Sequence, residues 1–302
     1  MSNITTFPSS RVVSEPVKHF DDDSELYFDT WERPAFFQGN DIGNYYGDSN
    51  HKHIVRMYNG APKSLGIVGK NYKMLHNKEL CQSIEQQFVE SMSNDQLEGV
   101  QVKDNISYYG ATSIRQYIFP NITADIGSDE SRVMLRTIII NGYDGSSSFK
   151  LYNGAIDFFC ANGMVTGIYD VETRRHTAGL TIPSLVDKIK KSIDIFYLQA
   201  EHWKHWVGKE ISDEDAQTCY EAIPNASEGF VKKLLRQFHI ECLTHGRTVW
   251  ALYSAATYYA THDEGEFKTR ATEHDHSAST LINREKQIRS WISGDEFVNL
   301  AA

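Results

Sequence analysis

Apolar side chains in the first part of the chain fall in short runs that are separated by turn residues, which is the pattern of β-strands. Val100–Tyr109, Ser113–Phe119 and Arg132–Ile140 are rich in β-branched and aromatic residues. The stretch Ile138–Val165 adds two further β-like runs, and its dipeptides Asn141-Gly142 and Asp144-Gly145 are typical of turns. Together these runs predict an antiparallel sheet of five or more strands.

Helical periodicity is rare before residue 177 and dominant after it. One early helix is predicted to begin with Asn77 as its N-cap, because apolar residues then recur every three or four positions through Met92. Later helices are predicted over residues 182–206, 212–222, 229–244, 247–261 and 277–291. Strands followed by helices indicate an α+β fold in which a C-terminal set of helices covers the sheet.

The same pattern suggests how the chain is divided. Residues 1–25 are polar, contain Asp21-Asp22-Asp23 and are predicted to form a flexible acidic arm. Residues 26–222 are predicted to form an α+β core domain, and residues 223–302 a helical region packed on that core. Residues 26–62 show no clear periodicity, so we expect irregular structure packed by aromatic side chains in this part of the core.

Composition narrows the class of protein. With 302 residues, 40% of them hydrophobic, the chain can bury a substantial core. It contains no apolar run of membrane-spanning length and no signal-like start, so we expect no membrane association and a place in the cytoplasm of the host cell. The four cysteines are widely spaced in apolar or helical contexts, which favours buried thiols over disulfides.

The formal net charge of -10 argues against nonspecific adhesion to nucleic acid. Many of the acids lie near the N-terminus, however, and the signs are close to balanced between Lys103 and Lys191, which leaves room for a local basic groove. Basic and aromatic residues alternate there, as single-stranded nucleic acid requires. The candidate contacts are Lys150, Tyr152, Arg174, Arg175 and His176. The competing interpretation is that the aromatic residues belong to the core and the cations to its rim.

Two other functions stay open. Asp144 and Asp157 could bind Mg²⁺ in a nuclease or other phosphodiester enzyme. Alternatively, the acidic arm could belong to a non-catalytic factor that binds a host protein. No phosphate-binding loop or nucleophile motif is present, so the sequence assigns no catalytic residue, no metal ligands and, outside the Mg²⁺ alternative, no cofactor.

Several motifs together resemble a phage/plasmid-related family of domains of unknown function, number nine-three-two, over about residues 60–295. The motifs are Val68-Gly-Lys-Asn-Tyr-Lys-Met-Leu-His-Asn, Asn141-Gly-Tyr-Asp-Gly-Ser-Ser-Ser-Phe-Lys, Phe159-Cys-Ala-Asn-Gly-Met-Val, Arg175-His-Thr and Trp250-Ala-Leu-Tyr-Ser-Ala-Ala-Thr with Arg270. The family turn contains Asn141, Asp144, Gly145 and Ser146, and Tyr143 stands where the family usually has His.

The resemblance implies an origin in a phage, prophage or plasmid and a role in mobile-element DNA metabolism. We therefore expect a protein that binds single-stranded DNA, as a homo-oligomer that promotes strand annealing in recombination or replication. Host or phage replication proteins are further expected partners.

Overall fold

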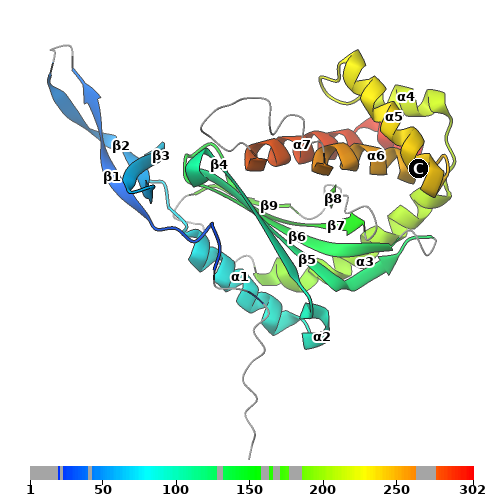
Figure 1. Ribbon diagram of the computed structural model, residues 1–302, viewed down its shortest axis with the longest axis horizontal. Helices are drawn as coiled ribbons and strands as arrows, with labels where there is room; N and C mark the ends of the chain where they lie inside the picture. Colours follow the sequence, from blue (N-terminus) through cyan, green and yellow to red (C-terminus); the bar gives the residue numbers. More distant parts are fainter. Residues whose placement is uncertain are drawn as a thin grey trace, which may run out of the picture.

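The computed structural model describes residues 20, 23–39, 43–127, 132–157, 163–165, 171–176, 186–262 and 277–302 (Figure 1). The predicted acidic arm, residues 1–25, therefore lies almost entirely outside the described residues.

The larger of two sheets is antiparallel throughout and is built on four long strands. These are β4 (Gln101–Ser107), β5 (Thr112–Asp125), β6 (Arg132–Gly142) and β7 (Phe149–Asp157), which lie side by side in that order. Two short strands, β8 (Gly163–Val165) and β9 (Val171–Arg174), pair with different parts of β7. The predicted α+β class, with antiparallel strands and helices in the C-terminal half, is confirmed.

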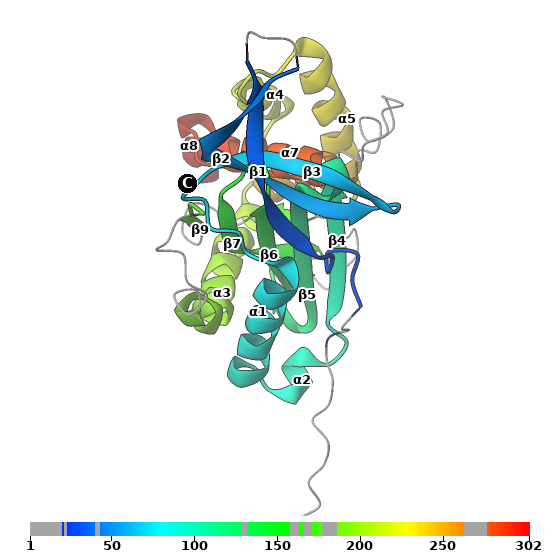
Figure 2. The ribbon, with the colours of Figure 1, turned by 90° about the vertical axis from the view of Figure 1, so that its left-hand side faces the viewer.

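Helices cover this sheet on opposite faces (Figures 1 and 2). On one face lie α1 (Asn77–Ser91) and α3 (Val186–Gly208), and the Phe88 ring of α1 packs 5.1 Å from the Tyr117 ring of β5. On the other face lies α7 (Ser277–Ile292), which contacts β4 and β5. Because both faces are covered, the central strands are buried on both sides, which explains the continuous apolar run Ile138-Ile139-Ile140 in β6.

Four helices form a cap around α7 and the end of α3: α4 (Asp213–Glu221), α5 (Glu228–His245), α6 (Val249–His262) and α8 (Asp295–Ala301). Trp203, Trp250 and Trp291 are fully buried where these helices meet. The Trp291 indole donates a hydrogen bond of 2.8 Å to the Cys219 carbonyl. Ser212 begins α4 with a capping box to Asp215, as its acidic first turn predicts. The short α2 (Asn94–Leu97) follows α1 and packs on β5.

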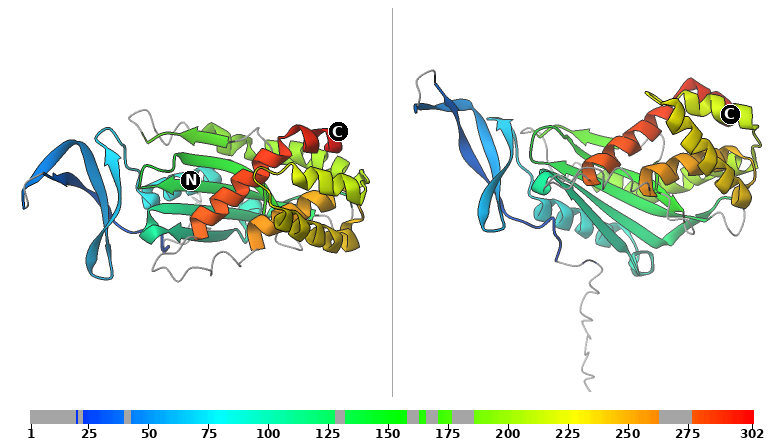
Figure 3. Two further views of the ribbon diagram at one scale, coloured as in Figure 1. Left: turned by 90° about the horizontal axis from the view of Figure 1, so that it is seen from above. Right: turned by 45° about the horizontal axis from the view of Figure 1, so that its top comes forward.

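The second sheet corrects the prediction of irregular structure for residues 26–62. Its strands are β1 (Thr30–Gln38), β2 (Tyr45–Tyr58) and β3 (Ala61–Gly69), all antiparallel. Register shifts between Pro34 and Ala35 and between Ile54 and Val55 interrupt the strict alternation that identifies a strand in sequence. The outer part of the β1–β2 hairpin also projects from the body, so neither face shows a hydrophobic pattern (Figure 3).

The described cysteines agree with the prediction of free thiols. Cys81 and Cys219 are buried and Cys242 is partly exposed, and none of the three forms a disulfide. Burial raises the pKa of Cys81 to about 11 and that of Cys219 to about 12, so both thiols stay protonated at neutral pH. Cys160 lies outside the described residues.

A buried ionic network attaches α7 to the sheet. Arg136 of β6 is 2% exposed, and its Nη2 donates a 2.7 Å hydrogen bond to Oε1 of Glu285 in α7. The Arg136 Nε also donates to Gln116 Oε1 at 2.9 Å, and the Tyr152 hydroxyl donates to Glu285 Oε2. Glu285 therefore neutralises a guanidinium that has left water.

Glu285→Gln tests this network. Because the substitution leaves the buried Arg136 charge without a counter-ion, we expect it to destabilise the fold by about 3–5 kcal/mol. Urea unfolding followed by circular dichroism measures the loss, with Glu296→Gln on the exposed first turn of α8 as the matched control. Equal stability of the two variants would contradict the assignment.

Candidate nucleic-acid interface

Three distant stretches of the sequence meet at the turn after β6. The buried Asn141 amide donates from Nδ2 to the Leu75 carbonyl at 3.1 Å and to Asn77 Oδ1 at 2.7 Å. The Asn77 Nδ2 in turn donates to the Leu26 carbonyl at 3.3 Å. The prediction of Asn77 as a helix cap is therefore wrong. The N-cap of α1 is His76, which makes no side-chain cap bond. The Asn77 side chain instead links Leu26 to Asn141 by hydrogen bonds.

Tyr143 has a structural role at the position where the related family usually has His. Its ring is fully buried in a small core with Ile54, Leu65 and Val68. Its hydroxyl accepts a 2.9 Å hydrogen bond from the Asn77 backbone N–H, and burial raises its pKa far above the ordinary value. The Tyr143 hydroxyl thus stays protonated and binds the start of α1 to the turn.

Asp144, Gly145 and Ser146 form a compact turn whose polar atoms bond one another. Asp144 Oδ1 accepts from the Ser146 N–H at 2.9 Å and from the Ser146 hydroxyl at 2.8 Å. Gly145 has a φ of 77°, which favours glycine. Gly66 of β3 packs directly on the turn, since a Cβ at Gly66 would lie 2.3 Å from the Asp144 Cα. The turn is therefore held between the two sheets.

The proposed Mg²⁺ pair is not brought together. Asp144 follows the end of β6, next to the start of β7, whereas Asp157 ends β7 and pairs with Val133 at the other end of the hairpin. Asp157 lies seven positions beyond Lys150 along β7, and Asp144 lies near the Lys150 end, so the two acids are roughly 20 Å apart. Across the described ranges, no three His, Cys, Asp or Glu side chains are grouped closely enough to hold a metal ion.

His176 is buried next to the turn instead of being open to a ligand. Its ring stacks on Tyr72 with the centroids 4.8 Å apart, and its Nδ1 lies 3.1 Å from the Lys73 carbonyl. The Tyr72 hydroxyl donates to the Gly142 carbonyl, which links this stack to the turn. Burial lowers the pKa of His176 below its ordinary value, although the Lys73 carbonyl and the charge of Asp144 oppose the shift. The Nε2 atom has no hydrogen-bond partner among the described residues.

The other predicted contacts lie on β7 and just after β9. Lys150 is half-buried on β7 and pairs with Thr173 of β9, whereas Arg174 pairs with Phe149. Arg175 follows β9 and is exposed. The side chain of Arg174 lies outside the described residues. Thr173, the partner of Lys150 across the β7–β9 pair, is therefore followed directly by Arg174 and Arg175.

Tyr152 is on the same face of β7 as Lys150, because the two are separated by one residue. It is buried under α7, and the Arg289 guanidinium lies 4.4 Å from the centre of its ring. A base could contact this ring only if Arg289 moved. In the described conformation Tyr152 supports Arg289 and Glu285.

Sequence reasoning missed two cations on α7 that join this region. The pKa of Lys150 is lowered by burial and then by the positive charges of Arg289 and Lys286, so the three side chains lie within electrostatic range. We call Lys150, Lys286 and Arg289 the basic seam. Lys286 and Arg289 are three residues apart and share one side of the helix, a spacing that could have indicated them once α7 was known to face β7.

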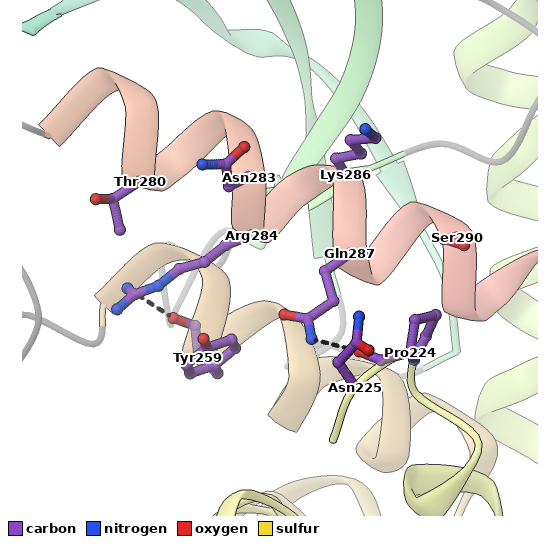
Figure 4. A pocket seen from close by; sticks show the side chains of 9 residues that line it. All are labelled: Pro224, Asn225, Tyr259, Thr280, Asn283, Arg284, Lys286, Gln287 and Ser290. Carbon is purple, nitrogen blue, oxygen red and sulfur yellow. Dashed lines mark hydrogen bonds between the residues drawn. The ribbon is translucent and has the colours of Figure 1, made fainter. Parts of the chain in front are cut away.

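α7 also borders a pocket of about 480 Å³, which Lys286 of the basic seam helps to line (Figure 4). Its Arg284 donates to the Tyr259 carbonyl at 3.3 Å, and its Gln287 donates to the Pro224 carbonyl at 3.1 Å. These side chains tie α7 to its neighbours, whereas Lys286 points the other way from the same helix. Lys286 is thus the residue that the basic seam and this pocket share.

Comparison with known proteins gives one match. A family model described as a domain of unknown function (DUF932) matches residues 64–285, in agreement with the predicted resemblance. Neither a curated protein nor a solved structure matches the chain. Among the described residues, none of the helices has both the length and the apolar content that a bilayer crossing requires.

Gly66→Ala tests the packing of β3 on the turn. The new methyl group would clash with backbone atoms of Asp144, so we expect a loss of about 1–3 kcal/mol in the free energy of unfolding. Gly69→Ala is the matched control in the same strand, since no atom lies within 4 Å of a Cβ there. Chemical denaturation compares them, and a Gly66→Ala protein as stable as the control would refute this packing.

His176→Gln tests the buried imidazole through pH. Because the folded pKa of His176 is below its ordinary value of about 6.5, the unfolded chain binds a proton that the folded chain excludes as the pH falls. The stability that neutral His176 contributes is fully present when the pH is above that ordinary value. It is lost as the pH falls toward the folded pKa, by up to about 1.4 kcal/mol per pH unit. Urea unfolding from about pH 7.5 to about pH 5.5 should show a shallower decline in His176→Gln than in wild type.

The exposed His202 of α3 provides the control for this measurement. His202→Gln should retain the pH dependence of the wild-type protein. If His176→Gln and His202→Gln have the same pH dependence, His176 is not the buried neutral group that we describe.

Proposed function

This chain belongs to the family described as a domain of unknown function (DUF932), and we propose that it binds single-stranded DNA along the basic seam between β7 and α7. The observation that carries the proposal is the convergence of Lys150, Lys286 and Arg289. We further propose that binding serves strand annealing in mobile-element recombination or replication.

Charge balance supports an anionic ligand at the seam. Glu285, on the same helix as Lys286 and Arg289, already accepts hydrogen bonds from Arg136 and Tyr152. No other carboxylate of the described residues forms an ion pair with a seam cation. Cations held together in this way repel one another, and a phosphodiester backbone relieves that repulsion while releasing counter-ions. This local excess stands out in a chain with a net charge of -10.

Arg289 favours a single strand over a duplex. Its guanidinium carbon lies 4.4 Å from the centre of the Tyr152 ring, and the residue as a whole is partly exposed although its Nε is buried. We propose that the face of the guanidinium turned away from Tyr152 receives a flat group. Unpaired bases stack on arginine planes, and stacking of this kind tolerates any sequence. In this proposal Tyr152 does not contact a base itself. Its ring supports the Arg289 guanidinium, on which the base stacks. The exposed Arg175 extends the proposed track from Lys150 past the end of β9.

The two alternatives gain no comparable support. The metal-dependent enzyme was built on Asp144 and Asp157, which lie at opposite ends of the β6–β7 hairpin. The host-binding factor was built on residues 1–25, which lie almost wholly outside the described residues. Incubating labelled single-stranded DNA with the protein and Mg²⁺ or Mn²⁺ separates binding from cleavage, because our proposal expects unchanged DNA lengths.

A triple variant, Lys150→Gln with Lys286→Gln and Arg289→Gln, tests the seam. Fluorescence anisotropy with a labelled oligothymidine over a salt series should show weaker binding, because three phosphate contacts are lost. The slope of log affinity against log salt should become shallower by about 2, since each phosphate contact on a single strand contributes about 0.7.

The matched control removes the same charge from the opposite face of the sheet. Lys78→Gln on α1 with Lys191→Gln and Lys204→Gln on α3 changes three exposed lysines there. We expect the control to keep the wild-type salt slope. Equal slopes for the two triple variants, or no salt-sensitive binding by the wild-type protein at micromolar concentration, would overturn the proposal.

A further inference from the structure

The outer part of the β1–β2 hairpin exposes four aromatic rings. Phe36 is 61% exposed, Phe37 55%, Tyr45 69% and Tyr46 48%. Phe37 pairs with Tyr46 and the two rings stack at 5.9 Å, whereas Phe36 pairs with Gly47 and so lies on the other face. Aromatic surface on both faces of a projecting hairpin is costly to leave in water, and such patches mark interaction sites.

This outer part, of which residues 35–39 and 43–50 are described, is also poorly supported by the rest of the protein. The third strand, β3, pairs only with residues 51–58 of β2, so residues 35–38 and 45–50 lie beyond its register. The hairpin extends away from the larger sheet in Figures 1 and 3. A two-stranded hairpin is marginally stable alone, so packing against a partner would stabilise it.

A second unpartnered apolar surface lies on α5, at the other end of the long axis (Figure 1). Ile240 is 57% exposed and Leu243 is 86% exposed. Their spacing of three residues places them on one side of the helix, with Arg236 one turn before Ile240. Arg247 follows the end of the helix and forms an ion pair with Asp213. We call Arg236, Ile240 and Leu243 the α5 face.

The charges of the two surfaces are complementary. The described residues of the outer hairpin contain Asp48 and no Lys or Arg. The Asp48 carboxylate accepts from the Asn50 N–H at 2.8 Å and lies 2.7 Å from His51 Nδ1. α5 contains Lys232, Lys233 and Arg236 against two carboxylates: Glu228, which forms an ion pair with Lys232, and Glu241, which is buried. Arginine beside apolar side chains suits aromatic rings, because a guanidinium stacks on their faces.

From these observations we propose that copies of this chain assemble head to tail, with the hairpin tip of one copy docked on the α5 face of the next. The partner is a second copy because the chain itself carries both complementary surfaces. They lie at opposite ends, so the contact is heterologous, and its repetition yields a ring or a filament. Such an assembly would line up several basic seams, but its formation requires no DNA.

Two variants and their mixture test the proposal in the absence of DNA. The tip variant carries Phe37→Ser and Tyr46→Ser, and the face variant carries Ile240→Gln and Leu243→Glu. Size-exclusion chromatography with light scattering over a range of concentrations should show wild-type protein growing beyond a monomer. Each variant alone should weaken self-association by roughly 30-fold or more, as expected for central interface residues.

An equal mixture of the two variants should recover a one-to-one dimer and nothing larger. The tip variant keeps an intact α5 face and the face variant keeps an intact hairpin, so only one contact per pair can form. Leu198→Glu, which changes a residue of α3 that is 67% exposed, should assemble as wild type does. Circular dichroism verifies that every variant is folded.

Three results would overturn the proposal. The first is a wild-type protein that stays monomeric at every concentration. If the tip variant of such a monomer also binds DNA less tightly, the tip is a DNA contact. The second is loss of assembly in the tip variant with wild-type assembly in the face variant, which would indicate a hairpin-to-hairpin contact. The third is a mixture that contains only monomers. None of these results bears on DNA binding at the basic seam.

Discussion

The position of α7 depends on one buried charge. Arg136 lies in the centre of the larger sheet, where a guanidinium is tolerated only with a counter-ion. Glu285 supplies the counter-ion from α7, and Tyr152 satisfies its second oxygen. Because Glu285 is used in this way, it is not available to neutralise Lys150, Lys286 and Arg289. A structural ion pair thereby leaves a local excess of positive charge on an acidic protein.

The motif turn after β6 has a different role from the one that its residue types first suggest. Asn141 joins the turn to Asn77, Tyr143 fills a small core, and Asp144 bonds its own turn. His176 stacks on Tyr72 at the same place. These contacts join the two sheets and the start of α1, so the residues that carry the family resemblance hold the fold together, while the proposed ligand surface lies on β7 and α7.

The parts of the fold that the sequence predicts are those where one local signal dominates. The periodicity of α1, the acidic first turn of α4 and the strands β4 to β7 each follow from nearby residues. The β1–β3 sheet could not be predicted in the same way, because its bulges and solvent-exposed faces remove the alternation. For the site, Lys150 follows from sequence, but Lys286 and Arg289 do not. They lie more than 130 residues away in the chain, and it is the packing of α7 on the sheet, including the buried Arg136–Glu285 pair, that brings them to β7.

The central claim, that single-stranded DNA lies along β7 and α7, is tested most directly by hydrogen–deuterium exchange with and without a saturating oligothymidine. Bound DNA should slow exchange in peptides that cover residues 149–157 and 282–290, and should leave α1 and the part of α3 on the opposite face unchanged. Protection on α1 and α3 alone, or no protection on β7 and α7 at saturation, would contradict the account.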